Sequence, residues 1–303
     1  RFSACQVRVM RTSMRAAAML CLSLESLYGS ALHNSTPAWA EELWRARSWS
    51  VSMDPNVHSA WDAASRLWQQ EPWSKSCTLE RVDLPSDALL DQGMLGIAPF
   101  IAAVPLERNQ RLRDMLQRLE LVTAMGNATC TPTAASSDRG DTEMMTVAEY
   151  VEDWLSREVS RNASENRYIF GEFGEEWGPY RDAYVLPPCE RCTRDLVAVT
   201  IGLGGLHSGA PWHGHGAAFV EVLHGAKHFS FLPPSDPGKK AVDVSVRGLS
   251  QLHWHREKRE KLAREGYLTG LIECTVFPGE LLFFPPNWLH GVTNAGQHTA
   301  FVS

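Results

Sequence analysis

Short apolar segments separated by turns rich in Gly and Pro dominate the chain from Leu196 onward. The segments that we expect to be strands are residues 196–202, 219–223, 228–232, 273–277, 281–284 and 299–302. One charged, helical insertion at 249–265 interrupts them. Many short strands with frequent turns are typical of an antiparallel barrel or sandwich. The turn spacing therefore predicts a mainly β fold with helices, of the α+β class.

The segments upstream of this region mix strands and helices. We expect strands at 77–82, 99–104 and 168–170, a loop at 130–142, and helices at 106–119 and 147–159. Thr146 and Glu149 stand in the spacing of a capping box at the start of the second helix. Six Trp residues between 34 and 75 indicate a helical segment that packs its aromatic face on the domain. The expected organisation is 34–75 as a Trp-rich helical segment, 76–195 as the N-terminal part of the fold, and 196–303 as its core.

Three histidines stand out as candidate metal ligands. His213 and His215 are separated by one residue, so on an extended chain both side chains project from the same face. A third ligand must come from elsewhere in the fold. The segment 278–290 supplies one, because a turn leads into a wholly apolar strand that ends in Pro-Pro, followed by Trp288 and His290. Two or three imidazoles on one face suit iron, zinc, copper or nickel.

These motifs resemble the JmjC family of double-stranded β-helix oxygenases. That family shows His-x-Asp/Glu, a Gly-x-Lys hairpin that ends in Pro-Pro, then Gly-Asp/Glu, a buried strand, Pro, Trp and His. This chain has His213-Gly-His215, Gly225-Ala-Lys227 and segment 278–290 in the same order. The resemblance covers residues 76–303 and is greatest for the small members of the endoplasmic reticulum lumen. It implies a jelly-roll, cupin-like barrel with an N-terminal helical elaboration.

The resemblance also implies the chemistry of the site. Members of the family hold Fe(II) with two histidines and one carboxylate, and leave positions open for 2-oxoglutarate and O₂. Here it implies His213, His215 and His290 as the metal ligands. The family's lysine binds the far carboxylate of 2-oxoglutarate, and Lys227 stands at that position. Lys227 is expected to point into the barrel, on the same face of its strand as Phe229 and Phe231.

The chain departs from the family pattern at two positions. His215 replaces the carboxylate ligand, which removes one negative charge from the metal site, and Ala210 replaces a hydroxyl residue that many members direct at 2-oxoglutarate. Two functions therefore stay open. One is an Fe(II)- and 2-oxoglutarate-dependent dioxygenase that hydroxylates a protein. The other is a non-catalytic lumenal JmjC protein that acts through protein partners.

The first residues have the order of a secretory signal peptide. The printed chain begins at Arg1, and Met10 and Met14 are candidate translation starts. From Met10 a basic stretch, a short apolar stretch and small residues follow one another, so we expect a signal peptide within 1–33. Glycosylation sequons at Asn34, Asn127 and Asn162 fit a glycoprotein of the endoplasmic reticulum lumen or secretory pathway.

Charge argues against some partners. Lys and Arg total 29, Asp and Glu total 35, and the net charge is −6. An acidic chain is a poor ligand for nucleic acid or an anionic membrane. The apolar stretch near the start is too short to span a bilayer, so we expect no transmembrane segment. The expected partner is a protein, either as substrate or as binding partner.

The remaining histidines and cysteines have plainer interpretations. We expect His253 and His255 to lie on the surface of the helical insertion, and His224 and His228 to be surface or hydrogen-bonded residues. Cys189 and Cys192 favour a local disulfide over a redox pair, because no thioredoxin-like strand and helix surround them. Cys77 and Cys274 lie in family-like segments and are a candidate pair across the fold.

Overall fold

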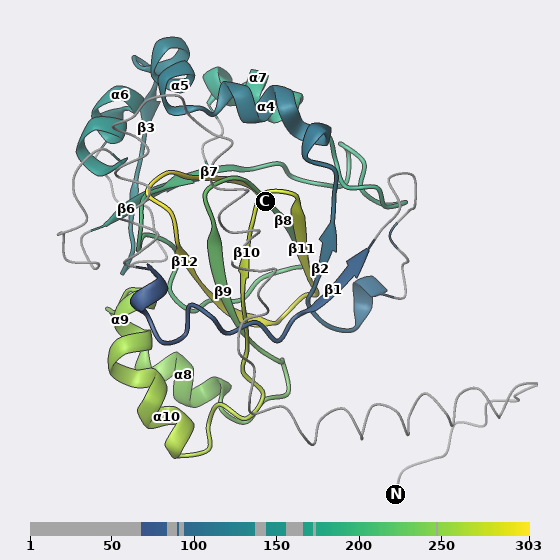
Figure 1. Ribbon diagram of the computed structural model, residues 1–303, viewed down its shortest axis with the longest axis vertical. Coiled ribbons are helices and arrows are strands. Elements are labelled where there is room, and N and C mark those ends of the chain that lie inside the picture. Colours follow the sequence, from purple (N-terminus) through teal and green to yellow (C-terminus); the bar gives the residue numbers. More distant parts are fainter. Residues whose placement is uncertain are drawn as a thin grey trace, which may run out of the picture. The chain divides into compact units, whose positions relative to one another are not determined.

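Two β-sheets face each other across an apolar interior (Figure 1). The computed structural model describes residues 68–83, 90, 94–136, 144–155, 166–171, 174–246 and 248–303. The larger sheet contains, in spatial order, β1 (Glu80–Asp83), β2 (Phe100–Ala103), β11 (Glu280–Phe284), β8 (Ala218–His224), β13 (Thr299–Val302), β7 (Ile201–Gly204), β6 (Arg167–Phe170) and β4 (Thr133–Ala134). The smaller sheet contains β10 (Ile272–Val276), β9 (Lys227–Leu232) and β12 (Leu289–Asn294). A separate pair joins β3 (Thr129–Cys130) to β5 (Met145–Thr146).

The chain passes repeatedly from one sheet to the other. From β8 it enters the smaller sheet at β9 and β10, returns through β11, crosses again to β12 and ends in β13 of the larger sheet. Every strand pairing among β7 to β13 is antiparallel. This winding is that of a double-stranded β-helix, and it confirms the cupin-like jelly roll with α+β content.

The alternation of side chains along the strands builds the barrel interior. Apolar residues at every second position of β8, β9 and β11 face inward, and these are Val220, Val222, Phe229, Phe231, Leu282 and Phe284. The intervening positions face outward, where Leu281 and Phe283 join a second apolar cluster. Both faces of these strands are buried because helices or loops cover the outer face. Continuous apolar segments such as 281–284 are the expected result.

Helices cover the outside of both sheets (Figure 1). Those packed on the larger sheet are η2 (Leu106–Asn109), α4 (Gln110–Met115), α5 (Arg118–Met125), α6 (Val147–Tyr150), the π-helix η3 (Val151–Leu155), η4 (Glu175–Trp177) and α7 (Gly178–Ala183). The insertion between β9 and β10 forms α8 (Lys239–Ser245), α9 (Gln251–Trp254), the π-helix η5 (His255–Arg259) and α10 (Glu260–Arg264). A short turn, η1 (Met94–Gly96), precedes β2. No helix among these described residues is long and apolar enough to cross a membrane.

Several local predictions can be compared with these elements. The capping box is present, since the Thr146 side chain accepts from the Glu149 amide and Glu149 accepts from the Thr146 amide. The helix expected at 106–119 is instead broken, because the buried His298 takes the Leu116 carbonyl as its hydrogen-bond partner. The strand β12 was not predicted. Its polar sequence gives no apolar alternation, and it exists through pairing with β9.

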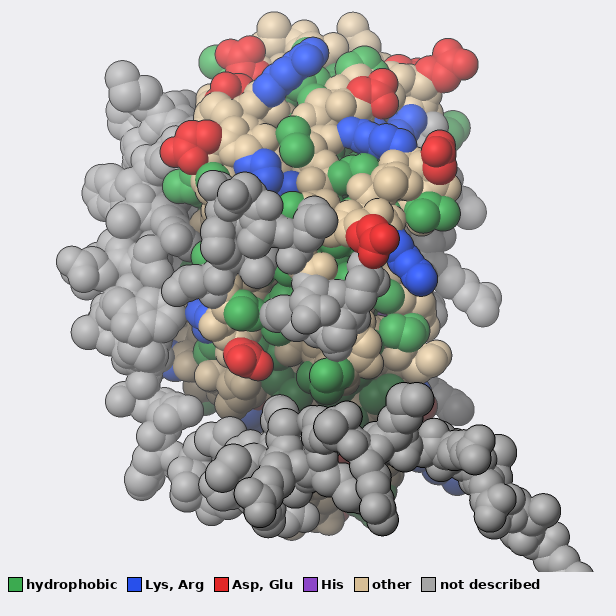
Figure 2. All heavy atoms as spheres, turned by 90° about the vertical axis from the view of Figure 1, so that its right-hand side faces the viewer, with side chains coloured by type: hydrophobic (Ala, Val, Ile, Leu, Met, Phe, Trp, Pro, Cys, Tyr) green, Lys and Arg blue, Asp and Glu red, His purple; other side chains and the backbone are tan. Residues whose placement is uncertain are grey.

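Part of the predicted organisation lies outside the described residues. The signal peptide at 1–33, residues 34–67 of the Trp-rich segment and the sequons at Asn34 and Asn162 all fall there. The acceptor of the remaining sequon, Asn127, is exposed at the turn after α5. On the face drawn in Figure 2, Lys and Arg side chains lie among Asp and Glu side chains and do not gather into a patch of one sign.

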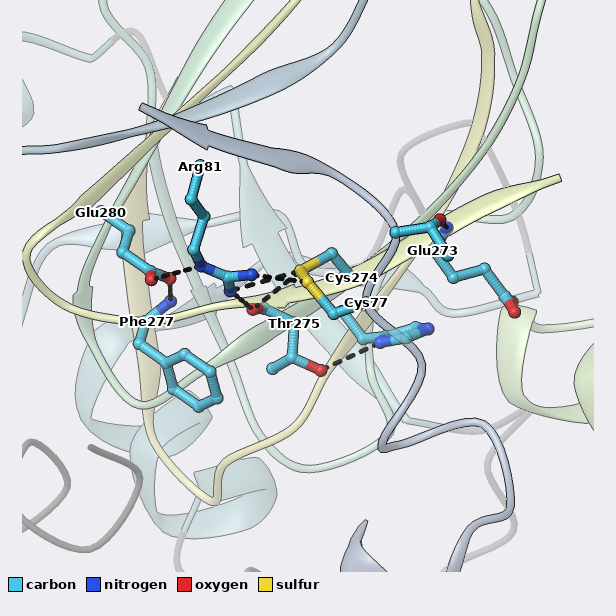
Figure 3. Close-up of a disulfide and its surroundings, with 9 residues drawn as sticks. Cys77, Arg81, Glu273, Cys274, Thr275, Phe277 and Glu280 are labelled. Carbon is cyan, nitrogen blue, oxygen red and sulfur yellow. Dashed lines mark hydrogen bonds and ion pairs between the residues drawn. A yellow bond between two sulfur atoms is a disulfide. The ribbon is translucent and has the colours of Figure 1, made fainter. Parts of the chain in front are cut away.

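Two disulfides join cysteines of the described chain. Cys77, just before β1, is bonded to Cys274 of β10, which confirms the suggested pairing across the fold (Figure 3). Cys189 and Cys192 form the expected local bridge. Arg81 lies beside the first disulfide, where its guanidinium donates to Cys77 Sγ and to Glu280 Oε1. The first described segment is thereby fixed to the smaller sheet and, through Glu280, to the larger one.

The disulfide to β10 is expected to contribute most of the disulfide stabilisation. Its cysteines are 197 residues apart in sequence, against 3 for the other pair, and a crosslink restricts the unfolded chain more when it closes a longer loop. Replacing Cys77 and Cys274 together by Ala should lower the free energy of unfolding by about 2–5 kcal/mol in urea denaturation. The matched variant, Cys189→Ala with Cys192→Ala, should lose roughly 1–2 kcal/mol. Equal losses would contradict this assignment.

Candidate metal centre

The two predicted ligand segments meet through their backbones. His213 and His290 form an antiparallel bridge in which each amide donates to the other residue's carbonyl at 2.8 Å. Their ring centroids are 4.2 Å apart. His290 lies in β12, whereas His213 lies outside any regular strand. The single bridge is enough to hold the His213 side chain beside that of His290.

His215 completes the group from the same side. Its ring centroid is 5.4 Å from that of His213 and 4.7 Å from that of His290. One ligand nitrogen from each of the three rings lies within 4.8 Å of the others. The predicted trio is thus brought together.

The hydrogen bonds of the three rings show which nitrogen of each ring can bind a metal. In His213, His215 and His290 the Nδ1 atom lies 2.7, 2.8 and 3.0 Å from a backbone carbonyl oxygen, respectively. A carbonyl only accepts, so each Nδ1 carries the hydrogen. The Nε2 atom of each ring is then the nitrogen that can coordinate a metal. A backbone partner at the other nitrogen is the usual way in which proteins orient metal-binding imidazoles.

Burial differs across the trio and gives the site a closed and an open side. His290 is 2% exposed, and its pKa is well below the usual range because of burial and the neighbouring His213. His215 is exposed, and so are the glycines on either side of it. Aromatic side chains pack around His290, with Phe284 at 4.6 Å and Phe231 at 5.9 Å between centroids. The site therefore has an apolar floor and an open mouth at His215.

Lys227 lies inside the barrel, as predicted. It is 4% exposed, its Nζ donates to Asn294 Oδ1 at 3.0 Å, and the ammonium lies 3.6 Å from the centre of the Phe301 ring. No ion pair of Lys227 is found within the described part of the chain. Burial lowers the pKa of Lys227 to about 7. Its charge also contributes to the lowered pKa of His290, which brings the lysine and the histidine trio into one electrostatic environment.

Two residues that position Lys227 were not predicted from the sequence. Asn294 stands directly across from Lys227 in the pairing of β12 with β9. Its amide nitrogen donates to Ser208 Oγ at 2.9 Å, and Ser208 donates in turn to the Gly205 carbonyl. This chain of bonds fixes the oxygen of Asn294 toward the lysine. The sequence signal that could have identified Asn294 is the polar end of β12, and this segment was not predicted to be a strand.

The expectation for two other histidine pairs was partly wrong. His224 and His228 are fully buried, and His255, expected at the surface, is 3% exposed. The helical insertion packs against the outer face of the smaller sheet, so the side of α9 and η5 that carries His255 is covered. His253, on another side of α9, is only partly buried and pairs with Ser250 at the helix start.

Comparison with known proteins agrees with this geometry. A family model described as a cupin-like domain matches residues 101–303. JmjC domain-containing protein 8 of Rattus norvegicus is 28% identical over 72% of this chain and 78% of its own length. The Homo sapiens protein of that name is 27% identical over 72% of this chain and 80% of its own length. Lysine-specific demethylase JMJ21 of Arabidopsis thaliana is 32% identical over 40% of this chain and 13% of its own length.

The buried lysine predicts a specific pH dependence of stability. The unfolded chain keeps Lys227 protonated up to the ordinary lysine pKa, whereas the folded protein begins to lose that proton near pH 7. The penalty for burying the charge is thus complete below pH 7 and declines as the pH rises toward about 10.5. Compared with Lys227→Met, the wild type should therefore gain thermal stability between pH 7 and pH 10. If the melting temperatures of the two proteins changed equally with pH across this range, the assignment would be contradicted.

Proposed function

The chain belongs to the cupin-like domain family, and we propose that it is an Fe(II)- and 2-oxoglutarate-dependent oxygenase of the JmjC type that hydroxylates proteins. Lys227 is the observation that carries this function. A buried ammonium without a carboxylate partner among the described residues is costly, and an anionic ligand would offset the cost. Such a lysine, on the inner face of the strand that pairs with the one carrying His290, supports a site for a metal and a dicarboxylate together with the three histidines.

The donor set fits an iron ion. His213, His215 and His290 would hold it through their Nε2 atoms, since each Nδ1 is already engaged with a carbonyl. When bound, iron and 2-oxoglutarate supply the oxidising chemistry, in which 2-oxoglutarate and O₂ give succinate and CO₂ and a C–H bond of the substrate is hydroxylated. The protein's own residues bind, orient and exclude water.

Lys227 would bind the far carboxylate of 2-oxoglutarate. Asn294 and the Phe301 ring hold its ammonium in place before the ligand arrives. The approach of a carboxylate favours the charged form of the lysine, so ligand binding would raise its pKa from about 7 and take up a proton. The aromatic residues around His290 would keep water from the floor of the site.

The open mouth at His215 favours a macromolecular substrate. His215 and the glycines on either side of it are exposed. A side chain of another protein could therefore reach a metal bound there without moving these residues. The same position favours the alternative function. An exposed imidazole in place of a carboxylate gives a less selective metal site, and a JmjC protein without turnover could act there through binding alone.

Turnover of 2-oxoglutarate separates these two functions. Purified protein with Fe(II), ascorbate and 2-oxoglutarate should release succinate, and His213→Ala should abolish the release. Lys227→Ala should bind iron but raise the KM for 2-oxoglutarate by about tenfold or more, because it removes a charge-assisted contact. Lys261→Ala, which changes an exposed lysine of α10, is the matched control and should match the wild type.

The result that would overturn the oxygenase is equally specific. Protein that holds iron, but shows neither succinate release nor a rise in melting temperature with 2-oxoglutarate, would be the non-catalytic form. A His215→Asp variant that gains turnover in that case would identify the missing carboxylate as the cause.

A location in the endoplasmic reticulum lumen is part of this proposal. Two disulfides in the described chain fit an oxidising compartment, and the exposed Asn127 is an accessible glycosylation acceptor. Protein from secreting cells should shift in electrophoresis after removal of N-glycans, and Asn127→Gln should reduce that shift. An unchanged shift in Asn127→Gln would contradict the use of this sequon.

A further inference from the structure

The outer face of the smaller sheet carries a second polar cluster. In the pairing of β9 with β10, His228 stands opposite Thr275 and Ser230 opposite Glu273. These four side chains alternate with residues that face the barrel interior, so all four lie on the outer face. Figure 3 shows the Glu273 side chain extending away from the disulfide made by the next residue in the strand. The cluster is therefore separated by the sheet from the side on which Lys227 lies.

This face is covered, and the cluster is buried. The helix η5 places His255 over it, and the first described segment places two tryptophans on the histidines. Trp73 stacks on His255 with ring centroids 4.6 Å apart, and Trp68 lies 5.3 Å from His228. His228, His255 and Glu273 are 0%, 3% and 3% exposed. Two imidazoles and a carboxylate thus meet where water has little access.

The hydrogen bonds assign the state of the His255 ring. Ser230 Oγ lies 3.1 Å from both Glu273 Oε1 and His255 Nε2. A hydroxyl has one hydrogen, and the carboxylate only accepts, so Ser230 donates to Glu273 and receives the Nε2 hydrogen of His255. The side-chain amide of Gln251 also lies 3.3 Å from this Nε2, and its Oε1 has no partner, so the amide turned end for end accepts the same hydrogen. With its hydrogen on Nε2, the His255 ring carries a lone pair on Nδ1. That Nδ1 has no hydrogen-bond partner and lies 3.6 Å from Glu273 Oε1.

A second unpartnered atom belongs to the same group. His228 Nδ1 pairs with Thr275 Oγ1 at 3.0 Å, and its buried Nε2 has no partner. One ligand atom each from His228, His255 and Glu273 lies within 4.8 Å of the others. In the tautomer in which His228 Nδ1 donates to Thr275, the His228 Nε2 atom is an acceptor, and unsatisfied buried acceptors are costly. A cation bound to these atoms removes that penalty.

We propose that His228, His255 and Glu273 form a second metal site, and that its occupant is Zn²⁺. Two imidazole nitrogens and one carboxylate oxygen are common zinc ligands, and a water can complete the tetrahedron. The 3.6 Å between His255 Nδ1 and Glu273 Oε1 is close to the edge of about 3.4 Å that bonds of about 2.0–2.1 Å give in a tetrahedron. Ser230 and Thr275 orient the two imidazoles by holding the opposite nitrogen of each ring.

Arg259 fits such a site as a partner of the carboxylate. Its guanidinium donates to Glu273 Oε2 at 2.5 Å and to Oε1 at the longer distance of 3.4 Å, and Oε1 is also the oxygen nearer to His255. A ligating carboxylate is commonly hydrogen-bonded in this way on its other oxygen. The Arg259 side chain is 29% exposed, so solvent reduces the repulsion between its charge and the metal.

A zinc ion here would join four parts of the fold. Its ligands come from β9, β10 and η5, and the tryptophans of the first described segment lie on two of those ligands. The π-helical turn begins at His255 itself, and such turns occur frequently at functional sites. The site has a structural role and stands apart from the proposed oxygenase chemistry.

Metal analysis in a background without the histidine trio tests the site. The full chain with His213→Ala and His215→Ala should retain about one zinc ion per molecule in mass-spectrometric metal analysis. Adding His255→Gln or His228→Gln should lower the zinc content by about tenfold or more at equal free zinc. His224→Gln in the same background is the matched control. It changes an equally buried histidine outside the cluster, and it should keep the zinc.

Spectroscopy adds a reading that does not depend on the stability of any cluster variant. Replacing zinc by Co²⁺ in the background protein should give the strong visible absorption of a tetrahedral site with nitrogen and oxygen ligands. Natively folded background protein that holds no zinc and gives no such absorption with Co²⁺ would overturn the proposal. Equal zinc loss in His224→Gln and His255→Gln would overturn it too, since the loss would then follow core destabilisation. Neither outcome affects the oxygenase, because the background already lacks the trio.

Discussion

Strand β9 is hydrogen-bonded along both edges, to β12 on one side and to β10 on the other, and its register with these strands determines where the polar groups meet. On its inner face Lys227 stands across from Asn294, and Phe231 stands across from His290. On its outer face His228 stands across from Thr275 of β10. Because side chains alternate between faces, a shift of β9 by one residue would exchange its inner and outer side chains. The apolar residues of the barrel interior hold the register, since such a shift would put the polar outer residues of β9 into that interior.

The candidate metal centre formed by His213, His215 and His290 is unusual in its charge. Three imidazoles form the candidate metal centre, Lys227 is buried in the same barrel, and the trio of candidate ligands contains no carboxylate. A divalent ion there would leave the site more positive than one with two histidines and an acid. Such a site would attract an anionic ligand but would select poorly among metals, since imidazole binds many of them.

The sequence predicted those parts of the protein that depend on local pattern. Short apolar segments between turns predicted β8, β9, β11 and β13, and the ordered motifs predicted the histidine trio and Lys227. Parts that depend on tertiary contact were missed. The strand β12 has few apolar residues and forms through pairing with β9, so Asn294 could not be placed opposite the lysine. His255 was expected at the surface because its burial requires the insertion to pack on the sheet, which no local pattern reveals.

The position of β13 has a consequence for how the polypeptide matures. Although it follows all the other strands in sequence, Thr299–Val302 lies in the middle of the larger sheet, between β8 and β7. A nascent chain that has emerged only as far as β12 must therefore leave both neighbours with open edges, and open edges invite pairing with other chains. The larger sheet is therefore continuous only after β13, which follows every other described strand, has been synthesised.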